Sequence, residues 1–168
     1  MLTFLMHSRA EWNDYFTGTP TYLQSNSYGA RQTPSGTSIY VLNCFFTSFT
    51  SGSDGGALYC TSATYFLIES TSFFSCKTSS QCGGAIYFYK NGGQCVLNEV
   101  CGYDCCSTYN GYSEGQFARI EVQNIASSKN YVNYSSISRC VNDYSSSHYT
   151  MLHHHGKICY PSVNISMN

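Results

Sequence analysis

The sequence has little charge and no long apolar run. Its 168 residues include 8 Lys or Arg and 9 Asp or Glu, which gives a formal net charge of -1. It therefore lacks the basic stripe that binding to nucleic acid needs, and the polybasic cluster that an anionic membrane surface attracts. No apolar stretch approaches the roughly 18 to 20 residues that span a bilayer. We predict neither a nucleic-acid partner nor membrane insertion by this segment.

A signal peptide is also missing from the printed chain. The apolar stretch that begins at Met1 ends after Met6, because His7 and Arg9 follow at once, and this is shorter than the apolar part of a secretory signal. We expect either a chain that stays inside the cell or an internal piece of an exported protein that continues into further repeats or a membrane anchor. The 10 cysteines favour an oxidising compartment.

What the sequence does contain is a repeat. Gly55-Gly56-Ala57-Leu58-Tyr59 returns 28 residues later as Gly83-Gly84-Ala85-Ile86-Tyr87. Self-similarity at a fixed period is typical of solenoid proteins. The 16% of aromatic residues, together with many β-branched ones, argues against disorder.

A second set of positions recurs in step with the glycine pairs. Each repeat has a hydrophobic anchor, followed three residues later by Phe or Cys. The anchors are Phe46, Phe73, Tyr103 and Ile137, and the followers are Phe49, Cys76, Cys106 and Cys140. Three short strands fit into each repeat: one after the glycine pair, one at an upstream apolar segment and one at the anchor. This predicts an all-β fold, a parallel β-helix of about four to five rungs.

A helical solenoid is disfavoured, because glycine pairs interrupt the repeats and no apolar run keeps a 3.6-residue period. Residues 1–37 carry no copy of the repeat, and we interpret them as an N-terminal cap or lead-in, with a disordered tail as the alternative. Residues 38–168 hold the β-helix repeats and stop in mid-repeat. This predicts a fragment, or a partner rung supplied by another chain.

The tetrapeptides at residues 55–58 and 83–86 resemble the G-G-A-[ILV] half of the repeat in the polymorphic outer membrane protein family. The other half, F-x-x-N, is matched without its Asn at residues 46–49 and 73–76. The richness in Cys, Ser and Tyr is closest to similar repeats in surface proteins of parasitic protists. The resemblance implies a right-handed, pectin-lyase-like parallel β-helix at a cell surface, used for adhesion or host contact.

The glycine pairs Gly55-Gly56 and Gly83-Gly84 allow two interpretations. A phosphate-binding nest is one, but neither pair belongs to a G-x-x-x-x-G-K-[ST] or G-x-G-x-x-G motif. The interpretation we prefer is a structural corner, where the loop enters a strand and glycine supplies the required backbone angles.

The cysteines allow three interpretations. Cys76, Cys106 and Cys140 occupy the same place in successive repeats, which favours a column of buried thiols, with disulfides between rungs as an alternative. A zinc site would have to use Cys95, Cys101, Cys105 and Cys106. The zinc interpretation is disfavoured, because there is no C-x-x-C and adjacent strand residues point to opposite faces. We predict no metal and no cofactor.

Glu69 and Glu99 each lie four residues before an anchor, so we expect them to stack in neighbouring rungs. Two carboxylates about 5 Å apart would raise one pKa and would suit a retaining glycosidase. Leu42 and Asn133 hold the same position in other repeats, which favours a solvated bend without catalytic residues. His153 and His155, with His148 nearby, are interpreted as an exposed polar segment in preference to a metal site.

Tyr59, Tyr87 and Arg119 are expected to stack on one outer face. Such a column binds sugar rings or a partner protein, or it stiffens the sheet with Arg119 in cation-π contact, and both interpretations stay open. Two sequons, at Asn133 and Asn164, would accept glycans in a secreted chain.

These observations predict a non-enzymatic surface or secreted module that binds a glycan or a host or partner protein. The alternative is a carbohydrate-active enzyme, a polysaccharide lyase or glycoside hydrolase, that uses Glu69 and Glu99. A decayed fragment without activity of its own is the third hypothesis.

Overall fold

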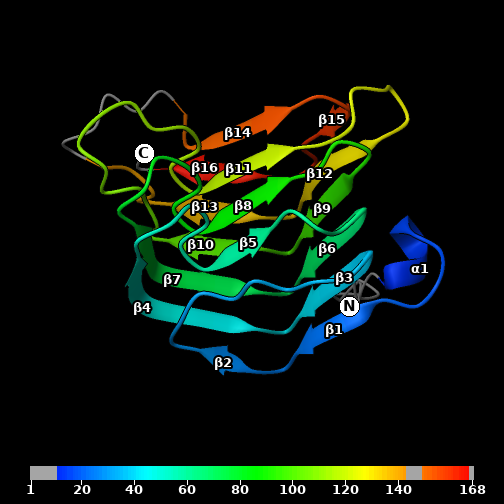
Figure 1. The fold of residues 1–168 in the computed structure, drawn as a ribbon, viewed down its shortest axis with the longest axis horizontal. Coiled ribbons are helices and arrows are strands. Elements are labelled where there is room, and N and C mark those ends of the chain that lie inside the picture. The colour runs from blue at the N-terminus through cyan, green and yellow to red at the C-terminus, as the bar shows by residue number, and fades with distance from the viewer. Residues whose placement is uncertain (1–10, 143–148, 167–168) are drawn as a thin grey trace, which may run out of the picture.

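The computed structural model describes residues 11–142 and 149–166. These residues form three sheets of parallel strands and one short helix, α1 (Trp12–Tyr15), which lies beside the sheets (Figure 1). The prediction of an all-β fold with parallel pairing is confirmed. No helix in the described part of the chain is long and apolar enough to cross a membrane.

The first sheet has the order β1-β3-β6-β9-β12-β15. Its strands are β1 (Thr21–Gln24), β3 (Ser38–Leu42), β6 (Tyr65–Glu69), β9 (Gln94–Asn98), β12 (Lys129–Asn133) and β15 (Lys157–Cys159). The second sheet contains β2 (Ser27–Tyr28), β4 (Phe45–Ser51), β7 (Ser72–Thr78), β10 (Cys101–Tyr103), β13 (Ser136–Ser138) and β16 (Asn164–Ser166). The third contains β5 (Leu58–Cys60), β8 (Ile86–Tyr89), β11 (Ala118–Glu121) and β14 (Met151–His154).

The chain visits the three sheets in turn, and each visit adds a strand beside the one from the preceding repeat. Ile39 of β3 pairs with Phe66 of β6, which pairs with Cys95 of β9. Residues 21–32 already follow this path: β1 and β2 join the first and second sheets, and Gln32 bridges to Leu58 of the third. The repeated path therefore begins upstream of Ser38, where the repeat becomes visible in the sequence.

The interior is built from alternate residues of every strand, because successive side chains of a strand point to opposite faces. Equivalent side chains stack from strand to strand: the rings of Tyr28 and Phe46 lie 4.8 Å apart at 20°, and those of Phe46 and Phe73 lie 5.0 Å apart at 7°. These spacings match the strand separation of about 4.7 to 4.9 Å. The core is therefore held by columns that each repeat extends by one residue.

The first sheet is covered on its outer face as well. Trp12 and Phe16, from the α1 segment, pack on Tyr40, Leu67 and Val96, and these residues form a second apolar cluster. Strands covered on both faces read as continuous apolar runs, which explains segments such as Ser38–Leu42. The lead-in thus packs against the side of the first sheet.

Sharp corners join the first sheet to the second. Each corner is a single residue whose φ lies between 45° and 54°. The residues are Ser25, Asn43, Ser70, Glu99, Tyr134 and Ser162. The left-handed conformation of a non-glycine residue costs about 1 to 3 kcal/mol. Hydrogen bonds between successive corners offset this cost, for example from the amide of Ser70 to the Asn98 carbonyl at 3.1 Å.

The predicted anchor Tyr103 is wrong by one residue. Phe73 pairs with Gly102, and Gly102 pairs with Ile137, so Gly102 holds the anchor position in β10. The Phe117 ring fills the space that a side chain at position 102 would occupy: a Cβ there would lie 2.8 Å from its Cδ2. Tyr103 points outward instead and is 39% exposed. Phe46, Phe73 and Ile137 are buried.

The middle member of the predicted cysteine column is wrong by one residue for the same reason. The amide of Cys76 donates to Sγ of Cys105, and the amide of Cys105 donates to Sγ of Cys140, both at 3.4 Å. The column is therefore Cys76, Cys105 and Cys140, and Cys106, although buried, lies one position further along.

The glycine pairs lie at the corner that leads into the third sheet. Gly55 and Gly83 have φ of 65° and 62°, the left-handed conformation that glycine adopts without steric cost. Gly56 is needed for space: a Cβ there would overlap the Gly84 carbonyl oxygen and lie 2.6 Å from that of Lys77. No helix follows either pair.

Candidate functional surfaces

Tyr59 and Tyr87 lie side by side on the outer face of the third sheet, in register with Arg119. Their rings are stacked, 5.2 Å apart at 12°. The guanidinium carbon of Arg31 lies 4.5 Å from the Tyr59 ring centre, and that of Arg119 lies 5.7 Å from the Tyr87 ring centre. Arginines thus close both ends of the tyrosine pair, so neither ring has a free face on which a sugar could stack.

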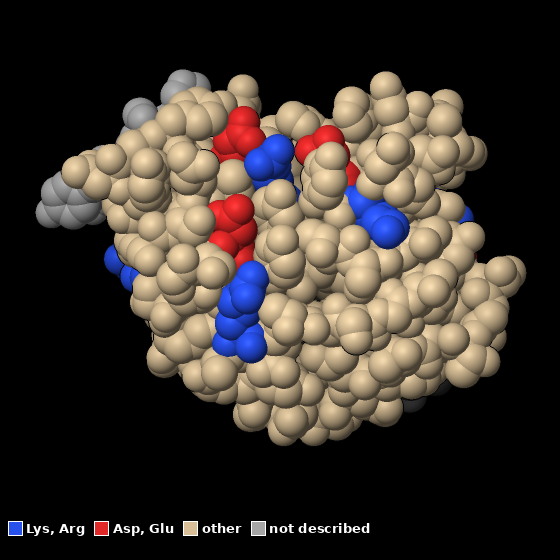
Figure 2. All heavy atoms as spheres, in the orientation of Figure 1, with Lys and Arg blue, Asp and Glu red and all other residues tan. Residues whose placement is uncertain are grey.

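Ion pairs and hydrogen bonds fix these two arginines. Arg119 lies 3.3 Å from Glu114 and 3.4 Å from Glu121, and Arg31 donates to the backbone carbonyls of Asp54 and Gly55 at 2.9 and 3.0 Å. Figure 2 shows that the charged side chains on this face gather in small groups of both signs. The tyrosine pair on the third sheet is therefore closed by its own contacts, and the charged groups around it form no patch of one sign.

The outer face of the second sheet is more open, although Arg139 lies 5.8 Å from the Tyr103 ring centre at one end of its aromatic pair. Phe74 and Tyr103 stack 5.2 Å apart at 7°, and 43% and 39% of these residues are exposed. They border a hollow of about 360 Å³, which Phe45 flanks on the other side. The small residues Ser72, Cys101, Gly102, Ser136 and Ser138 also line the hollow. Aromatic walls over a floor of hydroxyl groups suit a ligand with both apolar and polar parts.

A cleft of about 460 Å³ lies between the α1 segment and the first sheet. Trp12 lines one wall, and the outward side chains of Tyr22 and Gln24 from β1, and of Tyr40 from β3, line the other. The Tyr22 and Tyr40 rings lie 5.3 Å apart. Trp12 is 4% exposed, and its buried indole nitrogen has no hydrogen-bond partner among the described residues. The cleft therefore offers aromatic rings together with amide groups.

The two glutamates do not stack, so that prediction is wrong. Glu69 pairs with Asn98, and Glu99 follows as a corner residue beside Ser70, whose hydroxyl donates to its carboxylate at 2.8 Å. Glu69 is fully buried and accepts a hydrogen bond from the Tyr40 hydroxyl. The prediction of a solvated bend is therefore wrong for Glu69, because the α1 segment covers this part of the sheet. A buried carboxylate cannot reach a polysaccharide.

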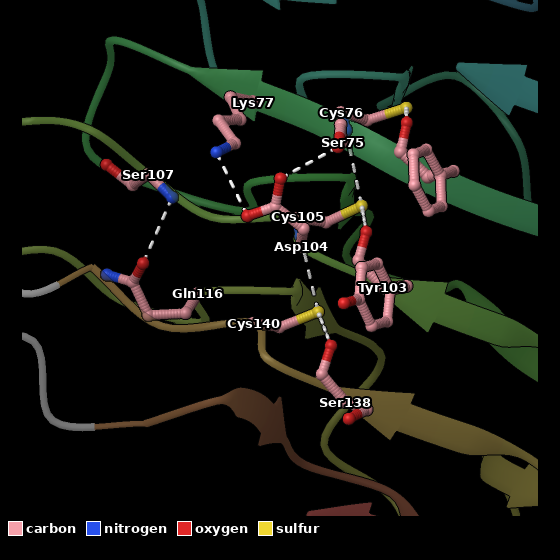
Figure 3. Close-up of polar contacts among 11 residues, drawn as sticks. Ser75, Cys76, Lys77, Tyr103, Asp104, Cys105, Ser107, Gln116, Ser138 and Cys140 are labelled. Carbon is pink, nitrogen blue, oxygen red and sulfur yellow. Dashed lines mark hydrogen bonds and ion pairs between the residues drawn. The ribbon is translucent and has the colours of Figure 1, made fainter. Parts of the chain in front are cut away.

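Cys76 of β7 lies above Cys105 and Cys140, which follow the ends of β10 and β13 (Figure 3). Each thiol donates to the carbonyl two residues earlier in its own strand, at 3.3 to 3.5 Å. Burial raises the pKa of Cys105, and the hydrogen bond with Cys105, together with burial, raises the pKa of Cys140. Thiols of this kind stay protonated and react slowly. All ten cysteines are free thiols in the structure.

Asp104 lies beside this column and joins two strands. It accepts a hydrogen bond from Ser75 at 2.7 Å and lies 3.0 Å from the Lys77 ammonium (Figure 3). Burial alone would raise the pKa of Asp104, but the contacts with Ser75 and Lys77 hold it below its usual value. Because the pair is partly exposed, it adds little to stability.

No group of three His, Cys, Asp or Glu side chains that could hold a metal ion occurs in the described residues. Cys101 is exposed whereas Cys95 and Cys105 lie in the core. His153 and His155 do not share a strand face, because β14 ends at His154 and His155 turns with a φ of 69°. The prediction of an exposed segment is wrong for His153, which packs against Tyr160 and is partly buried, whereas His155 is exposed. His148 lies outside the described residues.

The two sequons differ. Asn133 is buried, and its Nδ2, the atom that a glycan would occupy, donates to the Tyr15 hydroxyl at 3.0 Å. Asn164 lies exposed in β16. The folded chain therefore has room for a glycan at Asn164 and none at Asn133.

Scans against protein-family models, curated proteins and solved structures found no match for this chain. Neither the open hollow nor the cleft was predicted from the sequence. The hollow depends on the correct register of β10, and the only signal for the cleft was the concentration of Trp12, Tyr15, Tyr22 and other aromatic residues in the lead-in.

Proposed function

We propose that this chain is a stretch of right-handed parallel β-helix that acts by non-covalent binding, in adhesion at a cell surface or outside the cell. Three sheets that the chain visits in turn, and stacked columns with one residue from each repeat, support the β-helix. The glycine-pair tetrapeptides support it through their resemblance to surface-protein repeats. Because one scaffold of this kind serves many activities, the function has to be argued from the surface.

The observation that carries the binding proposal is the open hollow of the second sheet. Phe74 and Tyr103 present aromatic rings on parallel strands, which hold them rigidly, and hydroxyl groups lie beside them. Exposed aromatic side chains on a rigid support bind at low entropic cost. The partner is a glycan or protein surface that lays an apolar patch across the rings.

Binding without catalysis is favoured over an enzyme. Glu69 is buried and pairs with Asn98, so the two carboxylates that a glycosidase would need are not presented together to solvent. The hollow contains no carboxylate among its described lining residues.

The experiment compares beads coated with the chain on a glycan array and on intact cells, with and without glycosidase treatment of the cells. We expect Tyr103→Ala to reduce retention about tenfold, because it removes one aromatic wall. Tyr59→Ala is the matched control: it removes a tyrosine from the closed third sheet and should leave retention unchanged. Equal retention of both variants and the wild type would contradict the proposal.

The same glycans are then assayed for cleavage products. Retention without cleavage supports adhesion. Cleavage that Glu69→Gln abolishes would overturn adhesion in favour of the carbohydrate-active enzyme.

A further inference from the structure

The cleft between α1 and the first sheet is a second candidate binding site, separate from the hollow. It lies on the outer face of β1 and β3, whereas the hollow lies on the second sheet. Its volume of about 460 Å³ falls within the usual range for small-molecule sites. Two structural units form its walls, the α1 segment and the sheet edge, which is a common setting for ligand sites.

The lining of the cleft is rich in aromatic rings. Tyr22 and Tyr40 pair across β1 and β3 with ring centres 5.3 Å apart, and Trp12 lies 5.9 Å from Tyr40. Tyr22 is 48% exposed, so part of its ring is available to a ligand, whereas Tyr40 is buried. A ligand that enters the cleft meets Tyr22 as its stacking surface.

The walls supply neutral polar groups. Gln24 and Asn13 carry amides, and Thr19 carries a hydroxyl. The indole nitrogen of Trp12 is a buried donor without an acceptor among the described residues, and buried donors in proteins are normally paired. Amides can both donate and accept, as hydroxyl-rich ligands require.

The charge of the lining selects against anions. Among the described lining residues, Glu11 is the one carboxylate, and none is Lys or Arg. An anionic ligand would therefore meet a negative charge without a cation to balance it. A quaternary ammonium is disfavoured for a different reason. Aromatic cages enclose such a cation with several exposed ring faces, and of the three rings in this cleft Trp12 and Tyr40 are buried.

We propose that this cleft binds a neutral saccharide of about one or two rings, with the apolar face of one sugar ring on Tyr22 and its hydroxyl groups on Gln24 and Asn13. The site is independent of the hollow, and it gives the chain a second contact for a different part of a glycan.

Trp12 makes the test specific. It is the only tryptophan of the chain and it lines the cleft, so tryptophan emission reports on this cleft and is silent for binding at the hollow. The full chain is titrated with methyl glucoside, methyl galactoside, methyl N-acetylglucosaminide, lactose and cellobiose. Methyl glucuronide serves as the anionic match of methyl glucoside, and choline as the cationic probe.

We expect at least one neutral saccharide to change the Trp12 emission saturably, and methyl glucuronide to bind at least about tenfold more weakly than methyl glucoside. Tyr22→Ala should weaken saccharide binding about tenfold, because it removes the stacking surface. Tyr22→Phe keeps the ring and should retain most of the affinity. Gln24→Ala should weaken binding about fivefold.

Tyr103→Ala is the control for the other site and should leave the emission titration unchanged. Three outcomes would overturn the cleft proposal: no emission change with any neutral saccharide, a change with choline alone, or unaltered affinity in Tyr22→Ala. None of them affects the hollow, whose test is retention on beads. Conversely, loss of bead retention in Tyr22→Ala and not in Tyr103→Ala would place adhesion in the cleft and overturn the role of the hollow.

Discussion

The second and third sheets each carry a pair of stacked aromatic rings from neighbouring strands, but the surroundings of the two pairs differ. Tyr59 and Tyr87 are closed at both ends by arginines. Phe74 and Tyr103 have an arginine at one end, Arg139 beside Tyr103, and they border an open hollow. Stacked rings alone therefore do not identify a binding face. What decides is whether side chains cover both ends of the pair or leave a hollow beside it.

The residues around the two ring pairs differ because different segments of the chain lead into the two sheets. The third sheet begins at glycine corners, and loops that carry Asp54 and Glu114 surround it and anchor the arginines. The second sheet has small residues such as Ser72 and Ser136 around its rings. A closed face contributes to stability, whereas an open one is available for binding.

The largest expected effect is at the glycine corner of the third sheet. In Gly56→Ala, the new methyl group would overlap the Gly84 carbonyl oxygen, and backbone cannot move aside as a flexible side chain can. We expect a loss of about 3 kcal/mol or more in the free energy of unfolding, measured by urea denaturation. Gly52→Ala is the matched control, because a Cβ there meets nothing within 4 Å. Equal stability of the two variants would mean that the corner does not support the third sheet.

The next effect is a pH dependence at the C-terminal strand of the third sheet. Burial lowers the pKa of His153 to about 4, so the folded state favours the neutral ring. The stabilisation is complete above the unfolded pKa of about 6.5 and is lost as the pH falls from there towards 4.

We expect a loss of about 2 kcal/mol in the free energy of unfolding over this interval. His153→Asn should flatten the profile, measured by urea denaturation at successive pH values. The same slope in the wild type and the variant would contradict a buried neutral imidazole.

A smaller effect tests the register of the second sheet. Gly102→Ala would bring a methyl group against the Phe117 ring, which can shift, so we expect a cost of about 1 to 2 kcal/mol in the free energy of unfolding. In a Phe117→Leu background the same substitution should cost less, because the space is no longer filled. Additive costs in this double-mutant cycle would show that the two positions are not in contact.

The sequence was sufficient to predict an all-β fold with parallel pairing, because the glycine pairs and hydrophobic anchors repeat. The sequence predicted the wrong anchor in the repeat where a side chain from another segment fills the anchor's place. Gly102 has no ring of its own because Phe117, further along the chain, fills its place, so the pattern selected Tyr103. The Arg119 contact with Tyr87 was one of the predicted interpretations, but the contact that closes Tyr59 was hidden, since Arg31 comes from the lead-in. Contacts between segments without a shared period leave no signal in a repeat alignment.

The smallest expected effect on stability tests whether Arg119 closes the tyrosine pair of the third sheet. Arg119 covers Tyr87 and pairs with Glu114 and Glu121, so Arg119→Ala should cost about 1 kcal/mol in the free energy of unfolding and expose the Tyr87 ring. Arg139 lies 5.8 Å from the Tyr103 ring on the second sheet, and Arg139→Ala should cost at most about 0.5 kcal/mol. Urea denaturation gives both costs, and solvent-perturbation absorption reports the newly exposed tyrosine. If the two variants lose equal stability, the arginines do not distinguish the faces, and the openness of the second sheet comes from its small residues alone.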